Sequence, residues 1–160
     1  MSDQLDQLAA ELGRRLAGAG FMLATAESCT GGWIAKCVTD IAGSSGWLDR
    51  GFVTYSNAAK QDLLGVSAET LAVHGAVSEP VVREMAAGAL ARSAAQVAVA
   101  VSGVAGPGGG TDDKPVGRVC FGFALPGAVT TETRSFSGDR ESVRRQAVAH
   151  ALTRLIALVG

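Results

Sequence analysis

The chain has 160 residues, 48% of them apolar, which is enough for one domain with a core that folds unaided. Fourteen basic residues against 15 acidic ones give a net charge of -1, which excludes the broad positive field that nucleic acids or anionic membranes attract. Aromatic residues make up only 5%, so platforms for stacking single-stranded bases are poorly supplied. We therefore expect a single domain over residues 1–160 with a small-molecule partner, and neither nucleic acid nor membrane.

The three cysteines, Cys29, Cys37 and Cys120, are odd in number and show no C-x-x-C spacing. This pattern favours neither a disulfide framework nor a zinc site. The N-terminal stretch carries acids where a secretory signal would carry positive charge, and no segment approaches the roughly 18 apolar residues of a membrane span. We expect a cytoplasmic protein.

The first half of the chain alternates helical and strand patterns. Leucines at positions 5, 8, 12 and 16 share one face of an opening helix, which Gly18 and Gly20 should end. "FMLATA" predicts a buried strand, and "SCTGGWIAKCVTDIAG" a helix with glycines near its start. "GFVTYS" predicts a second strand, and "NAAKQDLLGV" a short helix stopped at Gly65.

The second half predicts a long helix, a central strand and a hairpin. Ser78 is a candidate N-cap for the helix "EPVVREMAAGALARSA", and "QVAVAVSG" has the uncharged, β-branched character of a central strand. The irregular loop "GVAGPGGGTDDKPVG" follows, then the alternating segments "RVCFGFAL" and "VTTETRSF" and a last helix. This order predicts an α/β fold with a mixed sheet covered by helices.

The stretch "TAESCTGG" places a serine and a cysteine side by side at a strand-to-helix turn. Ser28 could be an ordinary N-cap, but the amides after it would also face an oxyanion formed at its oxygen. Cys29 is a competing nucleophile, because a helix N-terminus lowers a thiol pKa. Successive side chains diverge at such a turn, so only one of the two should face a pocket.

A serine nucleophile needs a base. His74, in a predicted loop, and His150, inside the last helix, lie in settings that favour structural roles. Lys60 follows the second predicted strand, at the sheet edge where Ser28 also lies and where open α/β sheets bind ligands. A desolvated lysine can accept a hydroxyl proton, although spacing alone also allows Lys60 to be a surface residue.

Two further segments could line a ligand site. The glycine-rich loop matches neither the P-loop nor the dinucleotide motif, and it is either a crossover or a ligand-lining loop with Thr111 and Lys114 as contacts. "SGDRESVRR" could offer Arg140 and Arg144, one turn apart, to a phosphate at a helix start. The alternative for this segment is a solvated first turn.

Taken together, "TAESCTGG", "TYSNAAKQDLLGV", "HGAVSEPVVREMA", "SGVAGPGGGTDDKPVG" and "FSGDRESVRRQA" resemble the CinA C-terminal domain family over nearly the whole chain. The resemblance implies a three-layer α/β/α sandwich, a homo-oligomer of two or more chains, and no metal or cofactor. It also implies hydrolysis of nicotinamide mononucleotide to nicotinate mononucleotide and ammonia, in the pyridine nucleotide cycle.

The resemblance further assigns site residues. It implies Ser28 as nucleophile, Lys60 as base and Tyr55 as a further catalytic residue. Asn57 is implied as a substrate-binding residue in the same site, and Arg140 as a phosphate ligand. Glu27 belongs to the first motif without an assigned step, and Asp112 and Asp113 depart from the family pattern. The remaining implied pocket residues are Thr30, Gly31, Gly106, Gly108 and Thr111.

The implied mechanism is that neutral Lys60 takes the Ser28 proton, the serine attacks the carboxamide, and water later releases the acyl group. Two alternatives remain at the level of sequence. One is a non-catalytic nucleotide-binding module with a competence or damage-inducible role. The other is an amidase for a different amide, because specificity lies in pocket shape.

Overall fold

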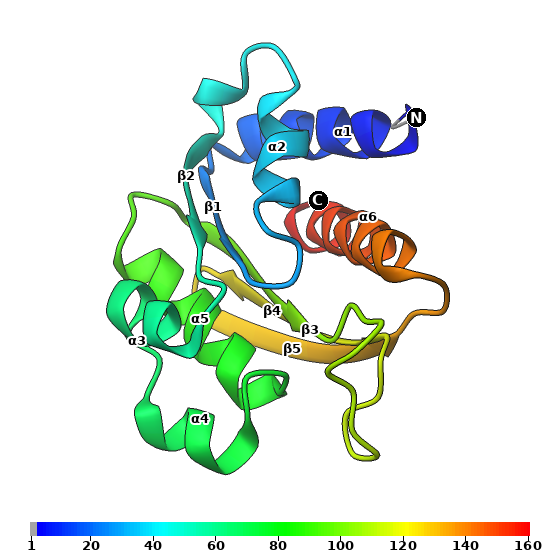
Figure 1. Cartoon of the computed structure of the whole chain (residues 1–160). Coiled ribbons are helices and arrows are strands. Elements are labelled where there is room, and N and C mark those ends of the chain that lie inside the picture. The colour runs from blue at the N-terminus through cyan, green and yellow to red at the C-terminus, as the bar shows by residue number, and fades with distance from the viewer. Residues whose placement is uncertain (1–2) are drawn as a thin grey trace.

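The computed structural model describes residues 3–160, which form one five-stranded sheet and its flanking helices (Figure 1). The strands are β1 (Leu23–Glu27), β2 (Leu48–Val53), β3 (Val97–Gly103), β4 (Arg118–Leu125) and β5 (Ala128–Ser135). The helices are α1 (Asp3–Ala19), α2 (Trp33–Thr39), α3 (Asn57–Leu64), α4 (Ala68–His74), α5 (Glu79–Ala91) and α6 (Arg140–Val159), with a short 3-10 turn, Ser44–Gly46, before β2.

The sheet is mixed, as predicted. Its order is β2-β1-β3-β4-β5, with β1 parallel to β2 and β3, and β4 antiparallel to β3 and β5. Figure 1 shows α1, α2 and α6 over one face and α3, α4 and α5 over the other. The predicted three-layer α/β/α class is therefore confirmed.

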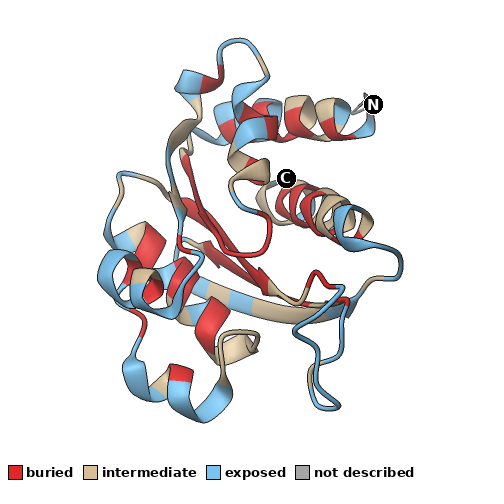
Figure 2. Cartoon of the chain, in the orientation of Figure 1, coloured by how far each residue is buried: buried red, intermediate tan, exposed pale blue. Residues whose placement is uncertain are grey.

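Each face of the sheet carries its own hydrophobic cluster. Alternate residues of β3 divide between them, since Val97, Val99 and Val101 pack under α1 and α6 while Ala98 and Ala100 face α5. Figure 2 shows the resulting buried centre. The α5 face is made of small residues, and a side chain at Gly122 would lie 2.4 Å from the Val82 carbonyl oxygen. Small residues thus let α5 lie close against the sheet.

Several helix boundaries follow the predicted local signals. Ser78 caps α5 by accepting a hydrogen bond from the Val81 amide, and Ser56 caps α3 through the Ala59 amide. Gly65 ends α3 in a left-handed conformation with φ 69°. The hairpin of β4 and β5 and the irregular loop between β3 and β4 are also found where the sequence placed them.

Three predicted features were wrong. Helix α2 begins at Trp33 and not at Ser28, because Gly31 and Gly32 adopt positive φ and extend the turn. Strand β2 ends at Val53, before the predicted Tyr55 and Ser56, because the chain turns there to start α3. His74 lies in α4, a short helix that the sequence analysis missed.

The missed helix has a weak apolar signal. Leu71 is its one buried residue, so the helix shows little periodicity in the sequence. Its recognisable mark is the N-cap Ser67, which accepts hydrogen bonds from two amides. Across residues 3–160, no helix is both long enough and apolar enough to cross a membrane.

Candidate functional site

A pocket of about 250 Å³ opens where β1 and β3 end and α3 begins. Its lining includes six of the residues that the sequence singled out, which are Ser28, Cys29, Tyr55, Asn57, Lys60 and, from the start of α6, Arg140. The carboxyl ends of parallel strands form the usual ligand edge of an open α/β sheet. The predicted site residues from three separate segments therefore meet at this edge.

Ser28 and Lys60 are in direct contact. Lys60 Nζ lies 3.0 Å from Ser28 Oγ, although the two residues are 32 positions apart in the sequence. Lys60 is 1% exposed and Ser28 is 7% exposed. The surface position that spacing alone allowed for Lys60 is therefore ruled out.

The surroundings of Lys60 favour its neutral form. Burial lowers the pKa of the Lys60 amine from its ordinary value. In the described part of the chain, no carboxylate forms an ion pair with it. Its amine also donates to the carbonyl oxygens of Thr54 at 2.9 Å and Tyr55 at 3.3 Å. A neutral amine has two N–H groups for these two carbonyls, and its lone pair is then left for the Ser28 hydroxyl proton.

Glu27 fixes the turn that presents Ser28. Its buried carboxylate accepts hydrogen bonds from the Thr30 hydroxyl at 2.6 Å, the Ile34 amide at 2.9 Å and the Ala35 amide at 3.0 Å. Free amides at a helix start need acceptors, and here the strand-end glutamate supplies them in place of Ser28. This gives Glu27, which the sequence analysis left without a role, a structural one.

Fewer amides after Ser28 are free to bind an oxyanion than the sequence predicted. The Gly31 amide donates to the Ser28 carbonyl oxygen at 3.1 Å, so it is not free to meet a substrate. Within residues 3–160, the amides of Cys29, Thr30 and Gly32 have no backbone acceptor. Cys29 and Thr30 follow Ser28 directly in the chain, so their amides are the candidate oxyanion donors.

Cys29 differs from Ser28 in its environment. Its side chain belongs to the hydrophobic cluster under α1 and α6, and burial raises the pKa of the thiol to about 12. The expected lowering by a helix N-terminus is absent, because α2 begins four residues later. A thiol with this pKa stays protonated at neutral pH and is a poor nucleophile.

Arg140 lies at the mouth of the pocket. Its guanidinium donates to the Gly106 carbonyl oxygen at 2.7 Å and lies 3.5 Å from the Tyr55 hydroxyl. The amides that start α6 are partly used, because the Asp139 carboxylate accepts from the Ser142 amide. A phosphate at the pocket mouth would therefore meet the Arg140 side chain and a helix start with fewer free amides.

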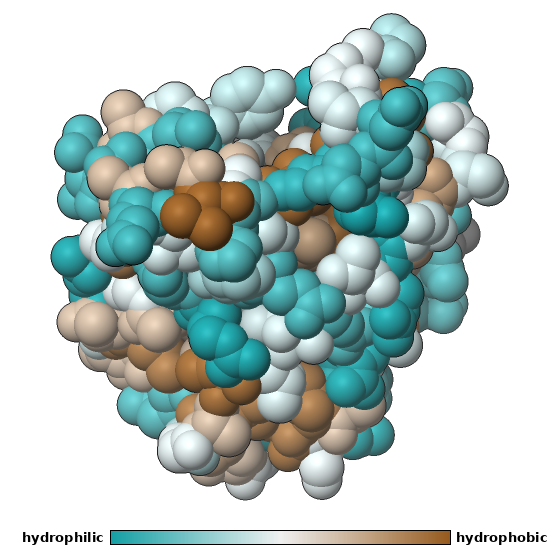
Figure 3. Space-filling model, turned by 90° about the horizontal axis from the view of Figure 1, so that it is seen from below, coloured by the Kyte–Doolittle hydropathy of each residue, from teal (hydrophilic) through white to brown (hydrophobic). Residues whose placement is uncertain are grey.

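The other predicted residues lie outside this pocket. The Thr30 hydroxyl is bound to Glu27, and Thr30 and Gly31 line a separate cavity. Gly108 and Thr111 lie in the exposed loop between β3 and β4, where Thr111 forms hydrogen bonds with Lys114. Figure 3 shows the face of the molecule that carries α4 and this loop. That face is largely hydrophilic, with hydrophobic groups among the hydrophilic ones. His150 contacts Glu132 of the edge strand β5 at 2.7 Å.

Some lining residues were not predicted as site residues. Ser102 and Gly103 at the end of β3, together with Ala76 and Val77 before α5, complete the pocket wall. Ser102 is 2% exposed, and the sequence predicted it as the end of a strand and part of a motif but not as a site residue. Its position at a strand end beside the pocket was the available signal. Over residues 3–160, no three His, Cys, Asp or Glu side chains come together as a metal site would require.

Comparison with known proteins identifies related chains. Residues 5–159 match the model of the CinA C-terminal domain. The chain is 59% identical over 153 residues to "Nicotinamide-nucleotide amidohydrolase PncC" of Escherichia coli K12, covering 95% of this chain and 93% of that protein. It is 60% identical over 150 residues to the protein of the same name from Enterobacter agglomerans, covering 93% and 92%.

Solved structures agree with these matches. A competence/damage inducible protein from Agrobacterium tumefaciens superposes with a TM-score of 0.94 at 49% identity, covering 98% of this chain and 96% of that one. A CinA superfamily protein from Klebsiella pneumoniae superposes with a TM-score of 0.94 at 43% identity, covering 97% of both chains.

Proposed function

Because the chain belongs to the CinA C-terminal domain family, we propose that it is a nicotinamide-nucleotide amidase, which hydrolyses nicotinamide mononucleotide to nicotinate mononucleotide and ammonia. The observation that carries the proposal is the buried contact between Ser28 Oγ and Lys60 Nζ at the floor of the pocket. The names of the relatives at 59% and 60% identity support the substrate.

The proposed reaction has two chemical stages. Neutral Lys60 takes the hydroxyl proton while Ser28 Oγ bonds to the carboxamide carbon, and the amides of Cys29 and Thr30 stabilise the oxyanion. The lysine then gives its proton to the leaving nitrogen, so that the C–N bond breaks and ammonia departs from an ester on Ser28. In the second stage Lys60 takes a proton from water, the hydroxide attacks the ester, and the proton returns to Ser28.

The other pocket residues bind and orient the substrate in this scheme. Arg140 pairs with the phosphate at the pocket mouth, and Tyr55 and Asn57 hold the ribose and the nicotinamide ring from the α3 side. Gly106 holds Arg140 through its carbonyl oxygen. For Thr30, Gly31, Gly108 and Thr111, a direct contact with substrate would require the turn or the loop to move. The reaction uses no metal or cofactor.

We also propose that residues 1–160 form one domain and that the protein acts as a homo-oligomer in the cytoplasm. The proposed reaction would be a step of the pyridine nucleotide cycle. Sedimentation of the purified chain measures the oligomeric state.

The testing experiment measures ammonia and nicotinate mononucleotide released by the purified chain. Nicotinamide mononucleotide should be hydrolysed, while nicotinamide and glutamine should not. Ser28→Ala should abolish release, whereas the matched control Ser135→Ala, at an exposed position of β5, should not change it. Hydrolysis of another amide alone would assign a different amidase, and no hydrolysis at all would favour a non-catalytic binding module.

A further inference from the structure

A second cavity lies on the other side of the turn that carries Ser28. It has a volume of about 480 Å³, larger than the 250 Å³ of the Ser28 pocket and within the usual range for small-molecule sites. Its walls come from the turn, from α2 and from α6. The lining residues are Thr30, Gly31, Gly32, Trp33, Lys36, Arg144 and Arg145.

The charged side chains that line the cavity are all positive. Lys36, Arg144 and Arg145 line it, and no acidic side chain lines it in the part of the chain that the structure describes. The two guanidinium groups lie 5.6 Å and 5.1 Å from the centre of the Trp33 ring, so they converge on one indole. Two guanidinium groups that lie this close to one ring repel each other. An anion bound between them would offset this electrostatic repulsion.

The acids that pair with two of these cations are exposed. Lys36 pairs with Asp40 and Arg145 with Glu141, both as exposed pairs one helical turn apart. Such surface pairs contribute little free energy, and the Glu141 contact is long at 3.5 Å with a carboxylate that is 74% exposed. A phosphate can accept several hydrogen bonds from arginines, so it would compete well with these carboxylates.

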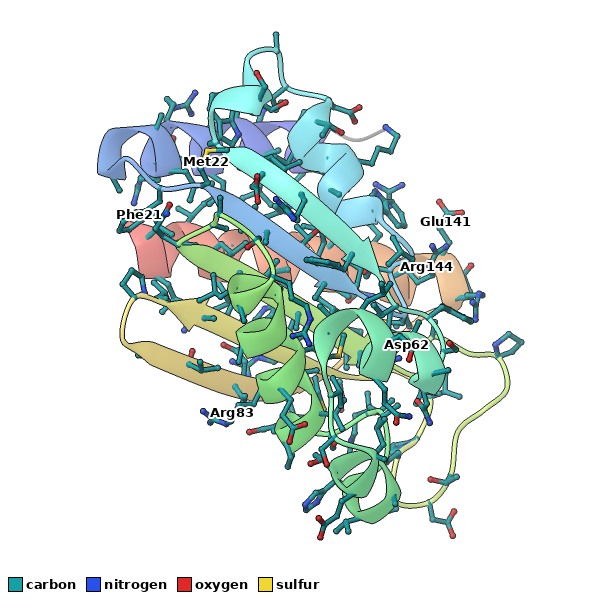
Figure 4. The ribbon with its side chains drawn as sticks, turned by 90° about the vertical axis from the view of Figure 1, so that its left-hand side faces the viewer. Phe21, Met22, Asp62, Arg83, Glu141 and Arg144 are labelled. Atoms are coloured by element: carbon teal, nitrogen blue, oxygen red, sulfur yellow. The ribbon has the colours of Figure 1, made fainter. Side chains whose placement is uncertain are left out.

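Arg144 connects this cavity to the catalytic turn. Its Nε donates to the Cys29 carbonyl oxygen at 3.0 Å and its Nη2 lies 3.3 Å from the Thr30 carbonyl oxygen. These are the residues that follow Ser28 directly. Figure 4 shows Arg144 and Glu141 near the same end of α6, beside the segment that joins β1 and α2. An anion that draws Arg144 away from these carbonyls would loosen the support of the Ser28 turn.

We propose that this cavity is a second binding site, for a phosphorylated small molecule, and that its occupation slows catalysis through Arg144. The anion takes the guanidinium of Arg144 together with Arg145 and Lys36. The Cys29 and Thr30 carbonyls then lose their donors, and the oxyanion amides of the same turn lose their alignment. The ligand thus lowers kcat without occupying the Ser28 pocket.

Binding is tested by tryptophan fluorescence, which does not depend on the proposed amidase activity. The chain has two tryptophans, and Trp47→Phe leaves Trp33 as the reporter inside the cavity. Among the residues that the structure describes, none accepts a hydrogen bond from the buried indole nitrogen of Trp47, so phenylalanine should be tolerated there. Titrated inorganic pyrophosphate should change the Trp33 emission. Calorimetric titration of the unaltered chain gives the same answer if the variant does not fold.

Two variants and a control locate the binding. Lys36→Gln and Arg145→Gln should each weaken pyrophosphate binding by about tenfold, the effect of one charge-assisted contact. Arg14→Gln, which removes an exposed charge on α1, should not. Titration with AMP and with adenosine then separates recognition of phosphate from recognition of a base, because adenosine should not bind. Two results would overturn the site. One is that neither pyrophosphate nor AMP binds, and the other is that Lys36→Gln and Arg145→Gln bind pyrophosphate as tightly as the unaltered chain does.

The coupling to catalysis is tested with nicotinamide mononucleotide as substrate. Pyrophosphate should lower kcat and leave KM unchanged, and the Arg145→Gln enzyme should need about tenfold more of it for the same effect. Purely competitive inhibition would instead mean that pyrophosphate occupies the substrate site, which overturns the coupling. If pyrophosphate binds to the cavity but the chain does not deamidate nicotinamide mononucleotide, the second binding site stands and only the proposed amidase function is removed.

Discussion

Thr30 donates its hydroxyl hydrogen bond to Glu27 Oε1 over 2.6 Å, and this buried contact closes the turn that holds Ser28 against Lys60. Glu27→Gln replaces one acceptor oxygen with an N–H₂ group, which would face the donors of Thr30, Ile34 or Ala35. We expect a loss of about 1 to 3 kcal/mol in the free energy of unfolding. Because the turn carries the nucleophile, kcat should fall more than KM changes.

The control for this prediction is Glu69→Gln, which changes an exposed carboxylate at the start of α4. Thermal unfolding and steady-state kinetics measured on both variants separate the two effects. A Glu27→Gln enzyme that loses stability but keeps its kcat would show that Glu27 caps α2 without positioning Ser28.

Cys29→Ala should leave most of the activity in place. The thiol lies in a hydrophobic cluster with its pKa raised to about 12, so almost none of it is thiolate at pH 8. Iodoacetamide at that pH should therefore inactivate the enzyme only slowly. Rapid inactivation that substrate prevents, or complete loss of activity in a folded Cys29→Ala variant, would transfer the nucleophile's role to the thiol.

Arg140→Ala should weaken recognition of the substrate phosphate. A charge-assisted contact is worth on the order of 1.5 to 3 kcal/mol, which corresponds to about a ten- to hundredfold loss in kcat/KM. The variant should also lose its preference for nicotinamide mononucleotide over the unphosphorylated riboside. Arg134→Ala, an exposed arginine of β5, is the charge-matched control. An unchanged preference in Arg140→Ala would assign the phosphate to other residues.

The sequence predicted the α/β class and the approach of Ser28 to Lys60, because strand-end positions and the resemblance both pointed to one sheet edge. It did not predict where α2 starts, because serine is a common N-cap and the true acceptor, Glu27, lies one residue earlier in a strand. It also misplaced the end of β2, since "TYS" has strand-like composition while Ser56 caps α3. Ser102 was missed because a lone serine in an apolar strand is marked as a site residue by nothing except its position at the strand end.

The activity should rise with pH as Lys60 loses its proton. The neutral amine is the working base, and burial lowers its pKa, so kcat should increase through a single ionisation below the ordinary value of about 10.4. A stopped assay of ammonia release from pH 6 to 10 measures the profile. A kcat that falls over this range would mean that the protonated lysine is the active form.

The same ionisation should affect stability, which provides an independent control. Between the folded pKa of Lys60 and the unfolded value of about 10.4, the unfolded chain binds one more proton, so the native state gains stability as pH rises. Lys60→Met lacks this group. The unfolding free energy of the unaltered protein relative to Lys60→Met should therefore increase between pH 7 and 10, by at most about 1.4 kcal/mol per pH unit.

Ser28 and Lys60 should behave as one unit in a double-mutant cycle. Ser28→Ala and Lys60→Ala should each remove nearly all deamidation and leave the fold intact, and the double variant should be little worse than either, because residues that act in the same step are not additive. Lys60→Arg should not restore activity, since guanidinium does not lose its proton in the accessible pH range. Substantial activity in Lys60→Ala, or losses that multiply in the double variant, would make Lys60 a substrate ligand and require another base for Ser28.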